Sequence, residues 1–94
     1  MDFEWDLAKS NSCQNSRNFD FAYVISVFVD PMLLVEYDRR WDYGEERLRA
    51  LGVIDGKIFV VIFTRRATAI RIISARRANY REVKRYEKNS SSYR

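Results

Sequence analysis

Residues 57–64 read Lys-Ile-Phe-Val-Val-Ile-Phe-Thr and form the most apolar stretch of the chain. Its β-branched and aromatic side chains predict a buried strand at the centre of a sheet. Asp55-Gly56 directly precedes it and is the strongest short signal for a two-residue β-hairpin. Residues 47–54 alternate polar and apolar side chains and predict the first strand of this hairpin. A basic turn at 65–68 leads to a further predicted strand at 69–74.

Two shorter segments upstream also have strand character. Residues 32–37 form an apolar run of strand length, and the charged residues 38–46 that follow predict a loop. Residues 3–5 alternate apolar and polar side chains, which is consistent with a short opening strand. The central pattern therefore predicts a meander of three or four antiparallel strands.

Helices are predicted before this meander. Asp6 is a suitable cap for a helix that begins at residue 7, but residues 10–18 lack an apolar stripe, and periodicity predicts a loop there. Asp20 can cap residues 21–28, where apolar side chains recur at i, i+3, i+4 and i+7. Three β-branched residues in this segment leave a strand open as the alternative.

The C-terminal part predicts one more helix and completes the fold class. Asn79 and Glu82 have the spacing of a capping box, which predicts a helix from Tyr80 to about residue 88. Residues 89–94 have no helix signal and are expected to form a flexible tail. We therefore predict a single α+β domain over residues 1–88, with N-terminal helices, a small antiparallel sheet and one C-terminal helix.

Composition excludes several classes of protein. The chain has no histidine, so the commonest metal ligand and general base is absent, and the single Cys13 cannot form an intrachain disulfide. No apolar run approaches the roughly 18 residues of a membrane helix. The first six residues are acidic where a signal peptide is basic. We expect a cytoplasmic protein that uses neither a metal nor another cofactor.

Basic charge is concentrated at the C-terminal end. Residues 1–64 have 7 Lys and Arg against 11 Asp and Glu, whereas residues 65–94 have 10 against 2, a net charge of +8. Folded onto one face, such a segment attracts phosphate backbones or an acidic protein partner. Composition alone is equally consistent with a solvated basic helix.

Arginines around the last predicted strand are candidate phosphate ligands. Alternation places Arg71 on the sheet face opposite to its isoleucine neighbours at 70 and 72. Arg76 and Arg77 follow the predicted end of the strand and are candidates to project beside Arg71, where guanidinium groups would bind phosphate bidentately. The alternative for Arg71 is an ion pair with a carboxylate such as Glu36 or Glu46.

Other candidates lie on the predicted hairpin and on the last helix. Arg65 and Arg66 are predicted at the hairpin tip, where a solvated turn is the simpler interpretation. Tyr80 and Tyr86 are six residues apart on the helix and therefore point to different sides. One of the two is a candidate for stacking or proton transfer, although packing in the core is the simpler role for each.

Several motifs, in chain order, resemble the BrnT family of type II toxins. They are Phe3-Glu4-Trp5-Asp6 with Lys9, Asp30-Pro31, Gly44-Glu45-Glu46-Arg47, Leu51-Gly52 with Asp55-Gly56, Ile70-Arg71-Ile72-Ile73-Ser74-Ala75-Arg76-Arg77-Ala78, and Arg85-Tyr86-Glu87. The resemblance implies a RelE-like ribonuclease fold, with a helix at 21–28. It also implies a toxin that inhibits translation by cutting RNA. The expected partner is a BrnA-type antitoxin with a ribbon-helix-helix portion, through which the complex binds its operator DNA.

The resemblance also implies site residues. Arg71 and Arg76 match the arginines of the family's Arg-Ile-Ile-Ser-Ala-Arg block, and Tyr86 matches the tyrosine of its last helix, so these three are the expected catalytic residues. Arg65, Arg66, Arg77 and Arg17 are expected to bind RNA. Many relatives carry Lys-His-Gly where this chain has Ser16-Arg17-Asn18. The alternatives to a metal-independent endoribonuclease are therefore a degenerate toxin that acts only in operon regulation, and a plain RNA-binding module.

Overall fold

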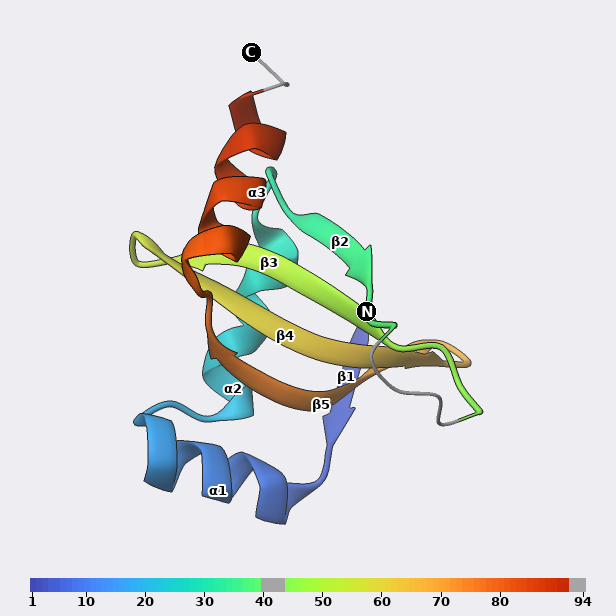
Figure 1. The fold of residues 1–94 in the computed structure, drawn as a ribbon. Helices are drawn as coiled ribbons and strands as arrows, with labels where there is room; N and C mark the ends of the chain where they lie inside the picture. Colours follow the sequence, from blue (N-terminus) through green and yellow to red (C-terminus); the bar gives the residue numbers. More distant parts are fainter. Residues whose placement is uncertain (40–43, 92–94) are drawn as a thin grey trace.

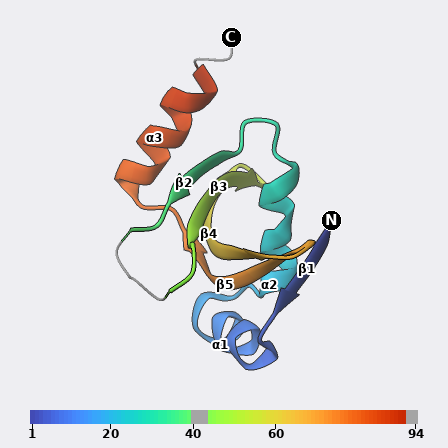
Figure 2. The same cartoon turned by 90° about the vertical axis from the view of Figure 1, so that its right-hand side faces the viewer.

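A five-stranded sheet lies at the centre of the protein (Figures 1 and 2). The computed structural model describes residues 1–39 and 44–91. The strands are β1 (Asp2–Trp5), β2 (Leu34–Tyr37), β3 (Leu48–Ile54), β4 (Lys57–Arg66) and β5 (Ala69–Arg77). Their order across the sheet is β1-β5-β4-β3-β2. All neighbours are antiparallel except β1, which pairs in parallel with β5.

Helices cover both faces of this sheet. They are α1 (Leu7–Arg17), α2 (Phe21–Val24), the 3-10 helix η1 (Ile25–Val29) and α3 (Tyr80–Ser91). Figure 2 shows α2 and η1 on one face and α3 on the other. The chain turns away after β1 pairs with residues 69–72, and α1 packs beside the rest of β5. None of the helices in the described ranges is long and apolar enough to cross a membrane.

The α+β class predicted from the sequence is confirmed, but the sheet has five strands instead of three or four. Its four antiparallel strands were all indicated by the sequence pattern, and Asp55-Gly56 forms the two-residue turn between Ile54 and Lys57. The fifth strand is β1. Its alternation was visible, whereas its parallel pairing with β5 depends on contacts between the two ends of the chain. Residues 40–43 of the predicted charged loop lie outside the described residues.

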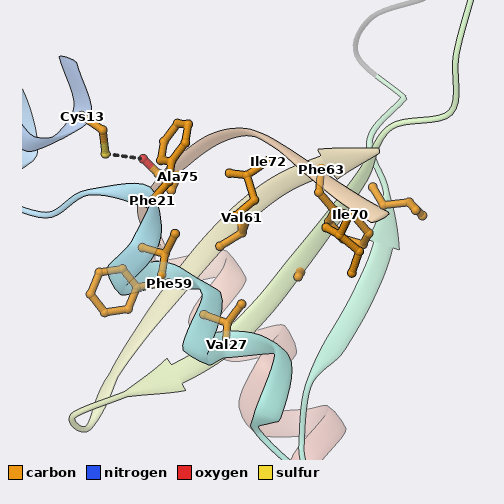
Figure 3. Packing of buried hydrophobic residues seen from close by; sticks show 12 residues of the cluster. Cys13, Phe21, Val27, Phe59, Val61, Phe63, Ile70, Ile72 and Ala75 are labelled. Atoms are coloured by element: carbon orange, nitrogen blue, oxygen red, sulfur yellow. Dashed lines mark hydrogen bonds between the residues drawn. The ribbon is translucent and has the colours of Figure 1, made fainter. Parts of the chain in front are cut away.

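The loop predicted at residues 10–18 is wrong, because α1 continues to Arg17. Asp6 caps the helix, as predicted, by accepting a hydrogen bond from the Lys9 N–H. Contacts with other segments of the chain stabilise the remainder of α1. The buried Ser10 hydroxyl oxygen accepts a bond from the Phe21 N–H at 3.0 Å, and the buried Cys13 thiol contacts the Ala75 carbonyl oxygen at 3.7 Å (Figure 3). Long-range contacts therefore replace the missing apolar stripe.

The segment at 21–28 is helical, which resolves the alternative of a strand. Asp20 caps it by accepting from the Tyr23 N–H, and the helix tightens to a 3-10 helix from Ile25 onward. Phe21, Val24 and Val27 are buried on the sheet. A Cβ atom at Gly52 would lie 2.7 Å from the Cβ of Val27, so glycine at 52 allows η1 to pack directly on β3.

Apolar side chains form a separate core on each face of the sheet. The larger one lies between the sheet and the helices α1, α2 and η1, and Figure 3 shows it around Phe59, Val61, Phe63 and Ile72. The smaller one, with Leu51, Val60, Ile62 and Tyr86, lies under α3. Because this second core is small, α3 depends on polar contacts as well.

The capping box predicted for α3 is confirmed. The Glu82 N–H donates to the Asn79 side chain and the Asn79 N–H donates to Glu82, each at 2.9 Å. The helix continues to Ser91, so the predicted tail begins too early. Residues 92–94 lie outside the described residues.

Candidate nucleic-acid interface

A β-bulge in β5 determines where its arginines point. Ile62 pairs with Ser74 and Phe63 pairs with Ile72, so Ile73 is the extra residue. Strictly alternating residues at 71 and 76 would lie on opposite faces, because they are five positions apart. The bulge brings Arg71 and Arg76 to the same face, the one that α3 partly covers.

Arg76 is bound to α3. Its two terminal nitrogens donate to the two carboxylate oxygens of Glu82 at 2.7 and 2.8 Å. The Glu82 side chain is only 3% exposed, and the hydrogen bonds from Arg76, with a smaller effect of Asn79, hold its pKa below the usual range in spite of burial. The guanidinium of Arg76 therefore neutralises a buried carboxylate.

Tyr86 lies in the smaller core, and its hydroxyl donates to Asp30 at 2.5 Å. Burial and this hydrogen bond raise the pKa of Tyr86 to about 12. Asp30 also accepts from the backbone N–H groups of Met32 and Val53. Burial raises the pKa of Asp30, but these three hydrogen bonds outweigh that effect and lower it overall. Tyr86 thus joins α3 to the segment between η1 and β2.

Arg71 makes a longer ion pair than Arg76 does. It lies opposite Glu4 in the parallel pairing of β1 with β5, and the closest charged atoms are 3.7 Å apart. The predicted partners Glu36 and Glu46 pair with other arginines: Glu36 accepts from Arg85 at 2.7 Å and lies 3.4 Å from Arg49, and Glu46 lies 3.7 Å from Arg65. Arg71 therefore has one long contact with a partly exposed carboxylate, and a phosphate could replace it.

Arg77 is separated from Arg71 and Arg76. Because β5 continues to residue 77, neighbouring side chains point to opposite faces. The Arg77 guanidinium lies 5.5 Å from the ring centre of Phe59, which belongs to the larger core. The expected group of three guanidiniums over one face is therefore not formed.

Arg65 and Arg66 lie at the end of β4 and not in the turn, which consists of residues 67–68. Each is exposed and lies 3.7 Å from a carboxylate of the segment before β3, Arg65 from Glu46 and Arg66 from Glu45. Contacts of this length between exposed groups contribute little to stability. Both arginines therefore stay accessible to a charged ligand.

A basic cleft of about 390 Å³ lies beside the bulge, between α1 and β5. We call it the β5 cleft. Its lining consists of Lys9, Ser12, Cys13 and Arg17 of α1, with Phe21, Arg47, Ile73, Ser74 and Ala75. Among the described residues, three cationic side chains and no carboxylate line this space. Ile73 and Ser74 lie between Arg71 and Arg76 along β5, although neither arginine is part of the lining.

Arg17 is the one predicted RNA-binding residue that lines the β5 cleft, whereas Lys9 and Arg47 were not predicted as ligands. Both occur in the quoted motifs, but nothing in their local sequence places them side by side. Lys9 reaches the cleft because α1 forms and lies beside β5, and that helix was only partly predicted. Arg47 reaches it from the residue before β3.

The chemistry available in the β5 cleft is that of cations. Cys13 is buried, and burial, the largest influence, raises its pKa, so it is a poor nucleophile. Across residues 1–39 and 44–91, His, Cys, Asp and Glu side chains form no group of three or more that could hold a metal ion. Arginine and lysine side chains around a concave space suit the binding of a phosphate group.

The fold and the cleft define a small α+β protein with a basic cleft suited to a phosphate group. The family model described as "Ribonuclease toxin, BrnT, of type II toxin-antitoxin system" matches residues 5–82 of the 94 residues. The chain belongs to this family of ribonuclease toxins. No curated protein matches the chain.

Proposed function

We propose that this protein is a metal-independent endoribonuclease that inhibits translation, and that the β5 cleft holds the scissile phosphate. The observation that carries the proposal is the set of three cations, Lys9, Arg17 and Arg47, that line one cleft, where the described lining residues include no carboxylate. Membership of a ribonuclease toxin family supports RNA as the source of the phosphate.

The proposed mechanism needs no histidine because RNA supplies its own nucleophile, the 2′-hydroxyl. The hydroxyl gives its proton to solvent water as it attacks the neighbouring phosphorus, which forms a pentavalent species with additional negative charge that preorganised cations stabilise. Loss of the 5′ oxygen then leaves a 2′,3′-cyclic phosphate. Arg17, Arg47 and Arg71 serve this role in our proposal. The Lys9 ammonium is suited to protonate the departing 5′ oxygen.

Arg76 and Tyr86 take supporting roles in the proposal. Each holds α3 against the sheet through a carboxylate, Arg76 through Glu82 and Tyr86 through Asp30. The direct catalytic role expected for them from the family resemblance stays a prediction. Substitution of each residue, with cleavage and stability measured separately, distinguishes the two roles.

Cleavage of RNA by the purified chain tests the proposal. We expect Arg71→Ala and Arg71→Lys both to slow cleavage, since lysine keeps the charge but lacks the planar fork of donors. Lys9→Gln is expected to slow cleavage as well, and Lys88→Gln, on exposed α3, is the matched control. Cleavage should persist in EDTA. Unchanged rates in Lys9→Gln and both Arg71 variants would exclude the β5 cleft as the active site.

We propose that the partner is a BrnA-type antitoxin with a ribbon-helix-helix portion, and that the complex binds operator DNA through it. Type II toxins are paired with protein antitoxins, which supports a protein partner. A partner that covers the β5 cleft with acidic or apolar residues would block RNA and stabilise the toxin. Co-expression of the neighbouring small protein should rescue growth and give a complex that co-purifies.

A degenerate toxin is the second candidate, because Arg17 stands where many relatives have histidine. Arg17 ends α1 and can hold phosphate, but it cannot act as a base at neutral pH. Asn18 replaces the glycine and keeps the left-handed conformation of the helix end, with φ of 66°. The geometry of the helix end thus tolerates the replacement.

The combined variant Ser16→Lys, Arg17→His and Asn18→Gly decides between the two candidates. If the natural chain does not arrest growth and the variant does, the chain is a degenerate toxin. If both arrest growth equally, the histidine is dispensable and the endoribonuclease proposal stands.

A further inference from the structure

A second and larger cleft lies on the other side of Arg17. It has a volume of about 580 Å³, within the range of ligand-binding clefts of roughly 300–1,000 Å³. It is bounded by the C-terminal end of α1, by α2, by the β3–β4 turn and by the end of β5. We call it the aromatic cleft. The lining residues used below are Arg17, Phe19, Tyr23, Lys57, Phe59 and Arg77.

Three aromatic rings form one wall of the aromatic cleft. Phe19 and Tyr23 each meet Phe59 edge-on, with ring centres 5.1 and 5.8 Å apart. The Tyr23 hydroxyl donates to Asp55 at 2.9 Å, which ties the ring to the β3–β4 turn. Tyr23 is nevertheless 39% exposed. It is therefore an aromatic ring in a fixed orientation and open to a stacking partner.

Three cations surround this wall, and both carboxylates in the lining are already engaged. Asp20 caps α2 at the Tyr23 N–H, and Asp55 accepts from the Tyr23 hydroxyl. Among the described residues, no carboxylate forms an ion pair with Arg17, Lys57 or Arg77. The available charge in the aromatic cleft is therefore positive.

We propose that the aromatic cleft binds one nucleotide of single-stranded RNA next to the scissile phosphate, with the base stacked on Tyr23 and the backbone phosphates at Arg17, Lys57 and Arg77. An aromatic ring flanked by cations is the arrangement by which proteins bind single strands. The inference rests on the proposed function, because it assigns a second contact to the same substrate.

The position of Arg17 favours RNA over an acidic peptide. Arg17 lines both the β5 cleft and the aromatic cleft, so one strand can continue from one cleft to the other. A stacking platform also matches a nucleobase better than a carboxylate side chain.

Binding of a defined RNA tests the inference. The probe is a fluorescently labelled, mixed-sequence RNA octamer with 2′-O-methyl groups throughout, so that no 2′-hydroxyl can attack. We expect Tyr23→Leu to weaken binding by about 5- to 150-fold, the range for loss of one stacked base. Tyr23→Phe keeps the ring and should bind within about threefold of the natural chain. Thermal unfolding of each variant shows that it is folded.

Cation variants test the phosphate contacts. Lys57→Gln should weaken binding of the same octamer, whereas Lys88→Gln, on the exposed surface of α3, should not. Equal binding by Tyr23→Leu, Lys57→Gln and the natural chain would overturn the inference. It would also be overturned if these variants lost affinity for the antitoxin but not for the octamer, because the cleft would then be a peptide site.

The two proposals fail in different ways. If Lys9→Gln and Arg71→Ala slow cleavage while Tyr23→Leu changes neither octamer binding nor cleavage, the aromatic cleft is excluded and the endoribonuclease stands. If the natural chain neither binds the octamer nor cuts RNA, the proposed function fails, and the inference fails with it.

Discussion

Glu82 shows at the scale of a single residue how buried charge is used to hold α3. Its carboxylate receives two hydrogen bonds from Arg76 and one from the Asn79 N–H. We expect Glu82→Gln to lower the free energy of unfolding at neutral pH by about 1–3 kcal/mol, because the charged hydrogen bonds between Arg76 and the Glu82 carboxylate are then lost. Glu87→Gln, on the exposed surface of the same helix, is the control. Chemical denaturation of the three proteins measures the difference.

The pH dependence of this effect has a defined sign. The pKa of Glu82 is lowered in the folded protein from its ordinary value of 4.5. Its stabilising contribution is therefore complete above that ordinary value and is lost as pH falls through the folded pKa. The difference in stability between the natural chain and Glu82→Gln should shrink on acidification. A difference that grows instead would show that the ion pair does not stabilise the fold.

The stabilisation provided by Tyr86 has the opposite dependence on pH. Its pKa rises from 10.0 to about 12, because burial and Asp30 disfavour the phenolate. The hydroxyl stabilises the fold below its unfolded pKa, and this contribution is lost as pH rises through the folded pKa. We expect Tyr86→Phe to lower the free energy of unfolding by about 1 kcal/mol at pH 7 and the gap to close between pH 10 and 12.

The same variant tests the role of Tyr86 in chemistry. In our proposal Tyr86→Phe cuts RNA at the rate of the natural chain when assayed well below its unfolding temperature. A large loss of cleavage in a folded Tyr86→Phe protein would instead support the direct catalytic role expected from the family resemblance.

Among the elements, α1 depends most on its surroundings. The Ser10 hydroxyl is the acceptor for the buried Phe21 N–H, so α1 and α2 share one hydrogen bond. We expect Ser10→Ala to lower the free energy of unfolding by about 1–3 kcal/mol, because the N–H group stays buried without an acceptor. Ser16→Ala, at an exposed position of α1, should change it by less than about 0.5 kcal/mol. Equal effects of the two substitutions in thermal unfolding would contradict this account.

This dependence also explains what could be predicted from the sequence. The strands β3, β4 and β5 follow from period-two patterns and from the Asp55-Gly56 turn, which act locally. Residues 10–18 have no such local signal. Their helix depends on Ser10 and Cys13, which contact residues far away in the chain. The parallel pairing of β1 was hidden for the same reason.

In the candidate site too, features that depend on local sequence could be predicted, and features that depend on the tertiary fold could not. Alternation correctly placed Arg71 opposite its isoleucine neighbours, since that depends only on the strand. The bulge at Ile73 and the continuation of β5 to residue 77 have no signal in the sequence. Together they put Arg76 on the same face as Arg71 and leave Arg77 on the other face. Lys9 and Arg47 join the β5 cleft only through the tertiary fold.

For the whole molecule, the charge pattern of the sequence differs from the charge pattern of the folded surface. Much of the C-terminal basic charge meets carboxylates: Arg76 meets Glu82, and Arg85 meets Glu36. The three cations of the β5 cleft come from residues 1–64, the part of the chain with net negative charge. Folding therefore brings positive charge to the β5 cleft from a part of the chain where composition did not indicate it.

This redistribution predicts which residues make RNA binding sensitive to salt. For single strands, the logarithm of the binding constant falls with the logarithm of salt concentration by about 0.7 for each phosphate contact. We expect the natural chain to lose affinity steeply for the uncleavable octamer between low and physiological salt. Lys9→Gln and Arg17→Gln should each make this slope shallower by about 0.7, whereas Lys88→Gln should leave it unchanged. A slope that depends on Lys88 as much as on Lys9 would mean that RNA senses the basic C-terminal segment as a whole and not the β5 cleft.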